Sequence, residues 1–376
     1  MDPWVQREAA DVAARAEREL EALVAVSTPS GDVHGGEEAA ALMAALLPPE
    51  AEVTRPACSS PGHAPDFEAR VRGTGGRRVL LLGHVDTVVA HRDHRPAERA
   101  HERIVGSGTV DMKGGVVLAL GVLRALARAP ERFGEVALLV VQDEEWRTAP
   151  FTHAARFDGW DACLCFEAGE RGPDGQEGVV VRRKAAGTMK VTARGVSSHS
   201  GSAPDVGRNA LLALTVAAQR VAECHDPHGP ERLTAVPTIL RSGEAFNVVP
   251  AAGELFCDIR ADALGALDRV APVVPAEVNG VRLDAHVVRR WPGMDAREAT
   301  SGLLEAASAR LGRPVIGAER GGASDASHLA GAIPLTVDGL GPRGGGAHAP
   351  TEFVLAASLG ERAQVALAVV DALLGP

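Results

Sequence analysis

The chain has 376 residues, of which 45% are hydrophobic and 23% are charged, a balance typical of a globular protein with a large buried core. Its formal net charge is −10 and it has no long basic stretch, so we exclude nucleic acid as an expected partner. No stretch approaches the roughly 20 apolar residues of a membrane helix, and the N-terminus lacks the apolar region of a signal peptide, so we expect a cytoplasmic protein with no membrane partner.

Helices and strands alternate in the first half of the chain. The predicted elements are helices over 5–26 and 36–47, strands over 66–72 and 79–83, a helix over 114–129, and strands over 135–141 and 162–166. This alternation indicates an α/β fold with a mostly parallel sheet and helices on both faces. In such sheets, ligands bind beyond the carboxyl ends of the strands.

The pattern changes after a polar segment rich in Gly and Pro, RGPDGQEG at 171–178, which we interpret as a loop or a domain boundary. The next elements are a strand over 188–194, a helix over 207–223, strands over 234–241 and 254–260, a helix over 262–270 and a strand over 281–289. This β-α-β-β-α-β order is typical of a ferredoxin-like domain. A helix over 299–311, a strand and a final helix over 353–374 then follow. We therefore predict an α/β domain in two parts, 1–184 and 291–376, interrupted by an inserted α+β domain over 185–290.

Acids and imidazoles gather where the predicted strands end. They are His84 and Asp86 in GHVDTV, Asp111 in GSGTVDMKGG, Asp143, Glu144 and Glu145 in VQDEEW, Glu167 in CFEAGE, and His348 and Glu352 in GAHAPTE. Each of these groups alone is also ordinary in a loop. Together, their carboxylates would repel one another unless a cation neutralised them. Imidazole and carboxylate ligands suit zinc, with cobalt or manganese as substitutes, so the pattern predicts a site for two divalent metals.

The motifs GHVDTV, GSGTVDMKGG, DEE, FE, SSHSG and GAHAPTE, in this order and at these separations, resemble those of a family of di-zinc enzymes. That family includes the aminoacylases, the acetylornithine deacetylases and the glutamate carboxypeptidases. The resemblance covers nearly the whole chain. It implies two Zn²⁺ per chain and hydrolysis of an amide bond in a dipeptide-like substrate or an N-acyl amino acid with a free carboxylate. It also implies a homodimer formed through the inserted domain, which would act as a lid and dimerisation domain.

The resemblance further implies a metal ligand at each of five matching positions. Asp111 would bridge the two metals. His84 and Glu167 would complete one site, and Glu145 and His348 would complete the other.

Three more residues match positions that serve the reaction. Asp86 would orient His84 through a hydrogen bond. Glu144 would be the general base that takes a proton from the attacking water and returns it to the leaving amine. His199, in SSHSG, would stabilise the oxyanion, often in the partner's active site. Taken alone, His199 is also typical of a turn.

Four residues match positions that contact substrate. Asn247 and Arg260 would hold the substrate's carboxylate, and Gly322 and Ser324 in RGGASDASH would line its pocket. From the residues alone, Asn247 is equally typical of a turn cap before a proline, and Arg260 of a solvated charge at a strand edge.

One segment departs from the family pattern. After DEE the family usually continues with a Gly-Ser turn that opens a helix, whereas this chain reads WRTAP over 146–150. We favour a glutamate-carboxypeptidase-like activity. The alternatives are an N-acyl amino acid deacetylase or desuccinylase, and a non-catalytic relative that binds amino-acid conjugates.

Overall fold

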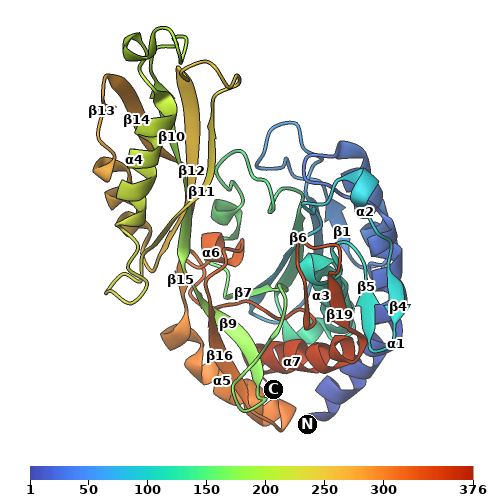
Figure 1. Cartoon of the computed structure of the whole chain (residues 1–376). Helices are drawn as coiled ribbons and strands as arrows, with labels where there is room; N and C mark the ends of the chain where they lie inside the picture. Colours follow the sequence, from blue (N-terminus) through green and yellow to red (C-terminus); the bar gives the residue numbers. More distant parts are fainter. Residues whose placement is uncertain (376) are drawn as a thin grey trace. The chain divides into compact units, whose positions relative to one another are not determined.

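A computed structural model describes residues 1–375 of the chain (Figure 1). The chain forms two units, and each unit has its own hydrophobic core. Unit 1 consists of Met1–Arg182, Asp295–Glu319 and the described residues from Ser324 onward, and unit 2 consists of Arg183–Met294 and Arg320–Ala323. Unit 2 is therefore an insertion in the sequence of unit 1.

The main sheet of unit 1 contains, in spatial order, β1 (Glu52–Thr54), β2 (Phe67–Arg72), β6 (Glu135–Val141), β3 (Arg78–His84), β7 (Ala162–Cys165) and β17 (Thr336–Val337). Strands β6, β3, β7 and β17 pair in parallel, whereas β1 and β2 are antiparallel to their neighbours. All of β3 after its first residue is buried, as expected for a strand covered on both faces. Its apolar run is the centre of the core.

The predicted α/β class is confirmed as a mixed α/β fold, but the sheets are not mostly parallel. Parallel pairing in the main sheet runs from β6 to the edge strand β17, whereas β1, β2 and the whole sheet of unit 2 pair antiparallel. The short link between β2 and β3, residues 73–77, explains why β2 runs antiparallel to the central strands. A parallel connection needs a crossover of about a dozen residues or more, so this short link reverses the chain direction.

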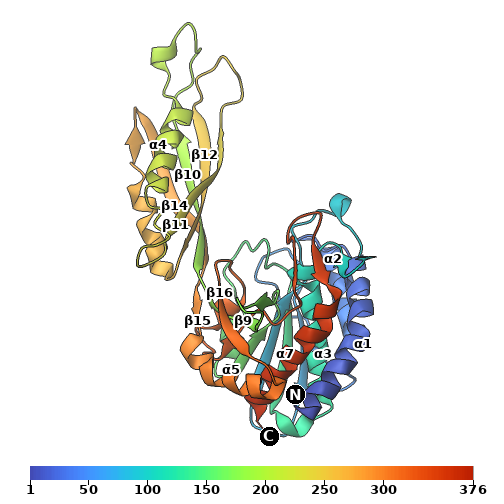
Figure 2. The same ribbon diagram turned by 60° about the horizontal axis from the view of Figure 1, so that its bottom comes forward.

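Three long helices, α1 (Pro3–Ala25), α3 (Gly114–Ala127) and α7 (Ala356–Leu374), lie side by side next to the main sheet (Figures 1 and 2). Helix α3 is buried along nearly its whole length, which its continuous apolar sequence permits. The other helices of unit 1 are α2 (Val33–Ala45), α5 (Arg297–Leu311) and the short α6 (Ala326–Leu329). Among the helices of residues 1–375, none has both the length and the apolar character that crossing a membrane requires.

Unit 1 also contains short strands that, apart from the strand expected after the helix over 299–311, the sequence pattern did not predict. One small sheet has the order β18 (Gly344–Gly345), β19 (Phe353–Leu355), β5 (Arg103–Val105) and β4 (Glu98–Ala100). Another joins β15 (Met294–Asp295), β9 (Glu177–Arg183) and β16 (Val315–Arg320), and β8 (Glu170–Arg171) pairs with β9. The segment RGPDGQEG thus contains the loop of a β8–β9 hairpin, in agreement with its interpretation as a loop.

Unit 2 is an antiparallel sheet with one α-helix. Its strands, in spatial order, are β11 (Thr234–Ser242), β12 (Ala252–Ala261), β10 (Ala185–Arg194), β14 (Val281–Trp291) and β13 (Glu277–Val278). Helix α4 (Ala210–Ala222) packs against β10, β11 and β12. The helix predicted over 262–270 forms instead as two 3₁₀ segments, Leu264–Arg269 and Ala271–Val273. Pro272 in the second segment cannot donate an N–H, which prevents a regular α-helix there.

A buried carboxylate on β9 ties together separate segments of unit 1. Glu177 accepts hydrogen bonds from Arg343 at 2.6 Å, from Arg362 at 3.0 Å and from Arg313 at 3.2 Å. The Arg362 side chain is 0% exposed, and burial lowers its pKa to about 10. Burial alone would raise the pKa of Glu177, but Arg343 and Arg362 outweigh it and hold that pKa below its ordinary value.

We predict that Glu177→Gln lowers the free energy of unfolding by about 3–5 kcal/mol, because it leaves buried guanidinium groups without their counter-charge. The pKa of Glu177 is lowered by folding, so its contribution is present above pH 4.5 and is lost as the pH falls through the folded-state pKa. Urea unfolding at pH 7 and at lower pH measures both effects, with Glu298→Gln on the exposed face of α5 as the control. A pH-independent loss below about 1 kcal/mol would contradict this role.

Candidate metal centre

Three neighbouring parallel strands end at the same edge of the main sheet. His84 is the last residue of β3, Glu144 and Glu145 follow β6, and Glu167 follows β7. Because β6, β3 and β7 are parallel neighbours, their carboxyl ends deliver these side chains to one place.

Two further side chains come from irregular backbone. Asp111 lies in the segment Thr109–Lys113, directly before α3, and its φ of −127° and ψ of 89° are not helical. The peptide bond between Asp111 and Met112 is cis. His348 lies between β18 and β19 in the left-handed region, with φ of 65°. Flanking glycines give this loop the freedom to turn sharply.

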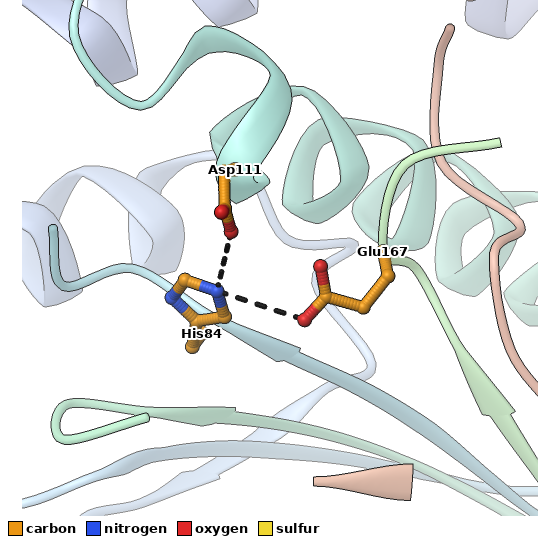
Figure 3. Close-up of side chains that lie close together, drawn as sticks. All are labelled: His84, Asp111 and Glu167. Carbon is orange, nitrogen blue, oxygen red and sulfur yellow. Dashed lines mark hydrogen bonds and ion pairs between the residues drawn. The ribbon is translucent and has the colours of Figure 1, made fainter. Parts of the chain in front are cut away.

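Asp111 joins two groups of side chains. In the first, the Nε2 atom of His84 lies 3.1 Å from Asp111 Oδ1 and 3.7 Å from Glu167 Oε1 (Figure 3). In the second, the Nε2 atom of His348 lies 3.2 Å from Asp111 Oδ2 and 3.0 Å from Glu145 Oε2. The five predicted metal ligands are therefore brought together, and Asp111 contributes a different oxygen to each group.

These donors fit divalent cations. Among residues 1–375, the groups His84–Asp111–Glu167 and Asp111–Glu145–His348 each place their ligand atoms within 4.8 Å of one another. In the described chain no donor reaches the buried Oε1 atom of Glu145, as expected for an oxygen that faces a cation. Imidazole nitrogens with carboxylate oxygens are a donor set for zinc, cobalt or manganese.

The electrostatics of the two groups also favour a cation. Burial alone would lower the pKa of His84, but hydrogen bonds with Asp111 and Asp86 raise it well above its ordinary value. Hydrogen bonds with Asp111 and Glu145 raise the pKa of His348 to about 10. The carboxylates thus draw positive charge onto both imidazoles, which is the charge that bound metal ions would supply.

Asp86 connects the first group to the segment after β6. The Nδ1 atom of His84 lies 3.1 Å from the backbone oxygen of Asp86 and 3.4 Å from its Oδ1. The two carboxylate oxygens of Asp86 accept the backbone N–H groups of Glu144 and Glu145, each at 3.1 Å. One buried side chain therefore orients the His84 ring and also fixes the two consecutive glutamates.

Burial raises the pKa of Glu144 well above the ordinary carboxyl value, and the neighbouring acids Asp325, Glu167 and Glu145 raise it further, against the opposing effect of His84. A carboxylate whose pKa is raised is a stronger base than an ordinary carboxylate and takes up a proton more readily. Glu144 is therefore suited to proton transfer.

Glu352 was not assigned a role from the sequence, although it ends the same GAHAPTE motif as His348. Its buried carboxylate accepts the backbone N–H of Gly108 at 2.9 Å, of Val110 at 2.8 Å and of Asp111 at 3.0 Å. These bonds hold the irregular segment that carries Asp111. The acid Glu352 is visible in the sequence motif. The spacing of residues along the chain does not show which backbone N–H groups this acid binds.

Two predicted residues lie together in unit 2. The backbone N–H of Ser200 donates to the oxygen of Asn247, and His199 forms a β-bridge with Val248. The Nδ1 atom of His199 accepts the N–H groups of Gly201 and Ser202, each at 3.1 Å. This places the ring proton of neutral His199 on Nε2, where it is a donor.

The other residues predicted to contact substrate are Arg260, Gly322 and Ser324, and they lie in different surroundings. Arg260 donates to Asp258 at 2.9 and 3.0 Å and to the oxygen of Gly321 at 2.7 Å, next to the exposed Gly322. A substrate carboxylate would therefore share this guanidinium with Asp258. Ser324 belongs to unit 1, is fully buried and donates its hydroxyl to Asp338 at 2.7 Å, so its side chain is placed to support the loop and not to contact substrate.

Known proteins resemble the chain over most of its length. The model of peptidase family M20/M25/M40 matches residues 80–372. Carboxypeptidase G2 of Pseudomonas sp. (strain RS-16) is 26% identical over 367 residues, which cover 93% of this chain and 87% of that protein. Succinyl-diaminopimelate desuccinylase of Methylorubrum extorquens (strain PA1) is 30% identical over 318 residues, which cover 77% of this chain and 81% of that protein.

The fold is also found among solved structures. Aminopeptidase PepT of Bacillus cereus has a TM-score of 0.75 to this chain at 19% identity, covering 96% of this chain and 99% of the other. At this level of identity the similarity concerns the fold alone.

We predict that Glu352→Gln weakens the binding of divalent metal by about 10–100-fold, because an amide cannot accept all three backbone N–H groups that hold the Asp111 segment. Competition with a chromophoric chelator measures the affinity. Glu98→Gln, on the exposed strand β4, is the matched control. Equal affinity in Glu352→Gln and the control would remove Glu352 from the support of the metal centre.

Proposed function

Since the chain belongs to peptidase family M20/M25/M40 and is an enzyme of the metallopeptidase and amidohydrolase class, we propose that it hydrolyses an amide bond in a dipeptide-like substrate or an N-acyl amino acid with a free carboxylate. Family membership confirms the resemblance that the motifs predicted. The observation that carries the proposal is Glu144, a half-buried acid with a raised pKa, directly beside the proposed ligand Glu145.

The proposed cofactor is two Zn²⁺ per chain, with Asp111 as the shared ligand. His84 and Glu167 would hold one ion, and Glu145 and His348 the other, in agreement with the two groups of ligand atoms. When bound, the ions would polarise the substrate carbonyl and activate water near neutral pH.

The protein's own groups would then handle the proton and the developing charge. Glu144 would take a proton from the attacking water and deliver it to the nitrogen of the leaving amine. Asp86 would hold the Glu144 backbone in place through the bond to its N–H. His199, whose Nδ1 accepts two backbone N–H groups, would donate from Nε2 to the oxyanion.

Asn247 and Arg260 would hold the free carboxylate of the substrate. A planar guanidinium suits this purpose, although Asp258 already occupies one edge of it. The similarity to carboxypeptidase G2 over 93% of the chain supports a glutamate-carboxypeptidase-like activity. The 30% identity to a succinyl-diaminopimelate desuccinylase supports desuccinylation as the second candidate. A purely binding role is disfavoured because the proposed base and all five proposed ligands are present.

Unit 2 would act as a ferredoxin-like lid and dimerisation domain. Its strands β11, β12, β10 and β14 follow the spatial order of that fold, with 3₁₀ segments in place of the second helix. Exposed apolar side chains on the edge strand β11 and on α4, namely Val236, Ile239, Leu240 and Leu212, support pairing between two copies of this unit.

For the homodimer, light scattering at micromolar concentration should give twice the 38.9 kDa of one chain. Replacing Ile239 and Leu240 with Lys should reduce that mass by half, because burying two uncompensated charges opposes association. A wild-type mass of one chain would contradict dimerisation and would restrict His199 to its own subunit.

For the reaction, we predict that Glu144→Gln lowers kcat by at least about 10³-fold while the metal content stays that of the wild type, because the base is lost and the ligands remain. The assay uses N-acetyl, N-succinyl and N-aminoacyl amino acids, each beside its carboxyl-amidated analogue. A chelator should abolish turnover, and the amidated analogues should show raised KM through loss of the contact with Arg260. Full activity in Glu144→Gln, or no preference for free carboxylates, would contradict these assignments.

A further inference from the structure

Glu144 and Glu145, the proposed base and a proposed metal ligand, lie in a segment without regular secondary structure. Between β6 and the 3₁₀ segment Ala154–Phe157, the described chain forms turns and irregular backbone, with no helix or strand. A base and a metal ligand must be held within about 0.5 Å of their working positions. Contacts other than a sheet or helix ladder therefore have to fix this segment.

An ion pair closes a short loop around the two glutamates. Arg147 donates from Nε and Nη2 to the Oδ1 atom of Asp143, at 3.1 and 2.7 Å. These two partners are four positions apart, and Glu144 and Glu145 lie between them in the chain. The Oδ2 atom of Asp143 also accepts the backbone N–H of Ser60 at 2.9 Å. The closing pair is thus fixed to a second, distant segment of unit 1.

The same guanidinium is anchored on a third segment. Its Nη1 and Nη2 atoms donate to Oδ1 and Oδ2 of Asp325, at 2.5 and 2.8 Å. Asp325 directly precedes α6 and is one of the acids that neighbour Glu144. The Arg147 side chain is 2% exposed, and those of Asp143 and Asp325 are 0% and 4% exposed. A buried guanidinium that bonds two carboxylates has little freedom, because its donors form a rigid planar fork.

Backbone N–H groups on both sides of the turn reinforce this loop. Asp86 accepts the N–H groups of Glu144 and Glu145, each at 3.1 Å. Beyond the turn, the N–H of Thr148 donates to the Oγ atom of Ser60 at 2.9 Å. All of these contacts lie within unit 1. The loop is therefore held from both ends by side chains that come from separate parts of one unit.

Resting on the proposed function, we propose that Arg147 is a positioning residue, which closes this loop and thereby sets the places of the base Glu144 and the ligand Glu145. Arg147 acts through Asp143 and Asp325 and contacts neither substrate nor metal. Displacing a reacting group by about 1 Å can cost about 10²-fold in rate. Of the two groups of candidate ligands, the loop contributes to only one, Asp111–Glu145–His348. A loosened loop would therefore weaken one metal site and leave the other.

Arg147→Lys tests the proposal, because it keeps the positive charge and removes the planar fork that reaches both acids. On the N-acyl amino acid that wild type hydrolyses best, we expect kcat to fall by about 10–100-fold at saturating zinc, with KM within about twofold of wild type. Zinc titration against a chromophoric chelator should show one ion bound about 10–100-fold more weakly and the other unchanged. Glu352→Gln should instead weaken both ions, since it supports Asp111, which both groups share.

Asp143→Asn is a second variant in case Arg147→Lys does not fold, since it leaves a charge-balanced Arg147–Asp325 pair in the interior. We expect the same kcat loss at constant KM and the same loss at one ion. Arg124→Lys is the matched control, because Arg124 is also buried and donates to the buried Glu19 at 2.8 Å, between α3 and α1. Its midpoint of unfolding in urea should fall as that of Arg147→Lys does, whereas kcat and the affinity for both ions should stay those of wild type.

Wild-type kcat and wild-type affinity for both ions in Arg147→Lys and Asp143→Asn would overturn the proposal. Weakening of both ions together with a raised KM, or a kcat loss that Arg124→Lys shares, would make Arg147 a support of the fold alone and would also overturn it. The zinc titration separates this proposal from the proposed function. If wild type hydrolyses no compound of the panel, the hydrolase assignment fails for these substrates. Selective loss of one ion in Arg147→Lys would still support the positioning role, and unchanged affinity for both ions would overturn it.

Discussion

The shared carboxylate of Asp111 is the interaction on which the metal centre depends. Its two oxygens lie 3.1 Å from His84 and 3.2 Å from His348, so any movement of Asp111 changes both groups of candidate ligands at once. Irregular backbone carries this residue, and no sheet or helix ladder fixes it. The three amide bonds to Glu352 provide that restraint, which makes a residue outside the ligand set part of its geometry.

The surrounding architecture accommodates a concentration of like charge that would destabilise an ordinary core. Three parallel strands bring acids to one edge, and Asp86 uses both carboxylate oxygens to fix the backbone beside Glu144. Buried acids without a counter-cation oppose folding, so the stability of unit 1 comes from elsewhere. The apolar strand β3, the buried helix α3 and the Glu177 ion pairs provide it.

The sequence predicted the long helices and the central strands of unit 1, and the residues that gather at its candidate metal centre. Apolar runs such as Val79–Leu82 mark buried strands, and an acid or imidazole at the end of such a run is visible without coordinates. Strand direction was not predictable from periodicity, because it depended on the short link over 73–77. The supporting roles of Glu352 and Arg147 were missed because residues distant in sequence bind them. Ser324 was predicted to line the substrate pocket, but its side chain is buried and bonded to Asp338, a contact that the sequence does not show.

The order of the ligands along the chain has a consequence for biosynthesis. Asp111 precedes the insertion, whereas Glu352, which binds its backbone, follows 241 positions later. His348 also lies beyond the insertion. A ribosome therefore produces Asp111 long before the residues that position it and complete the second group. The two groups of the candidate metal centre can therefore be complete only after the segment that carries His348 and Glu352 has left the exit tunnel.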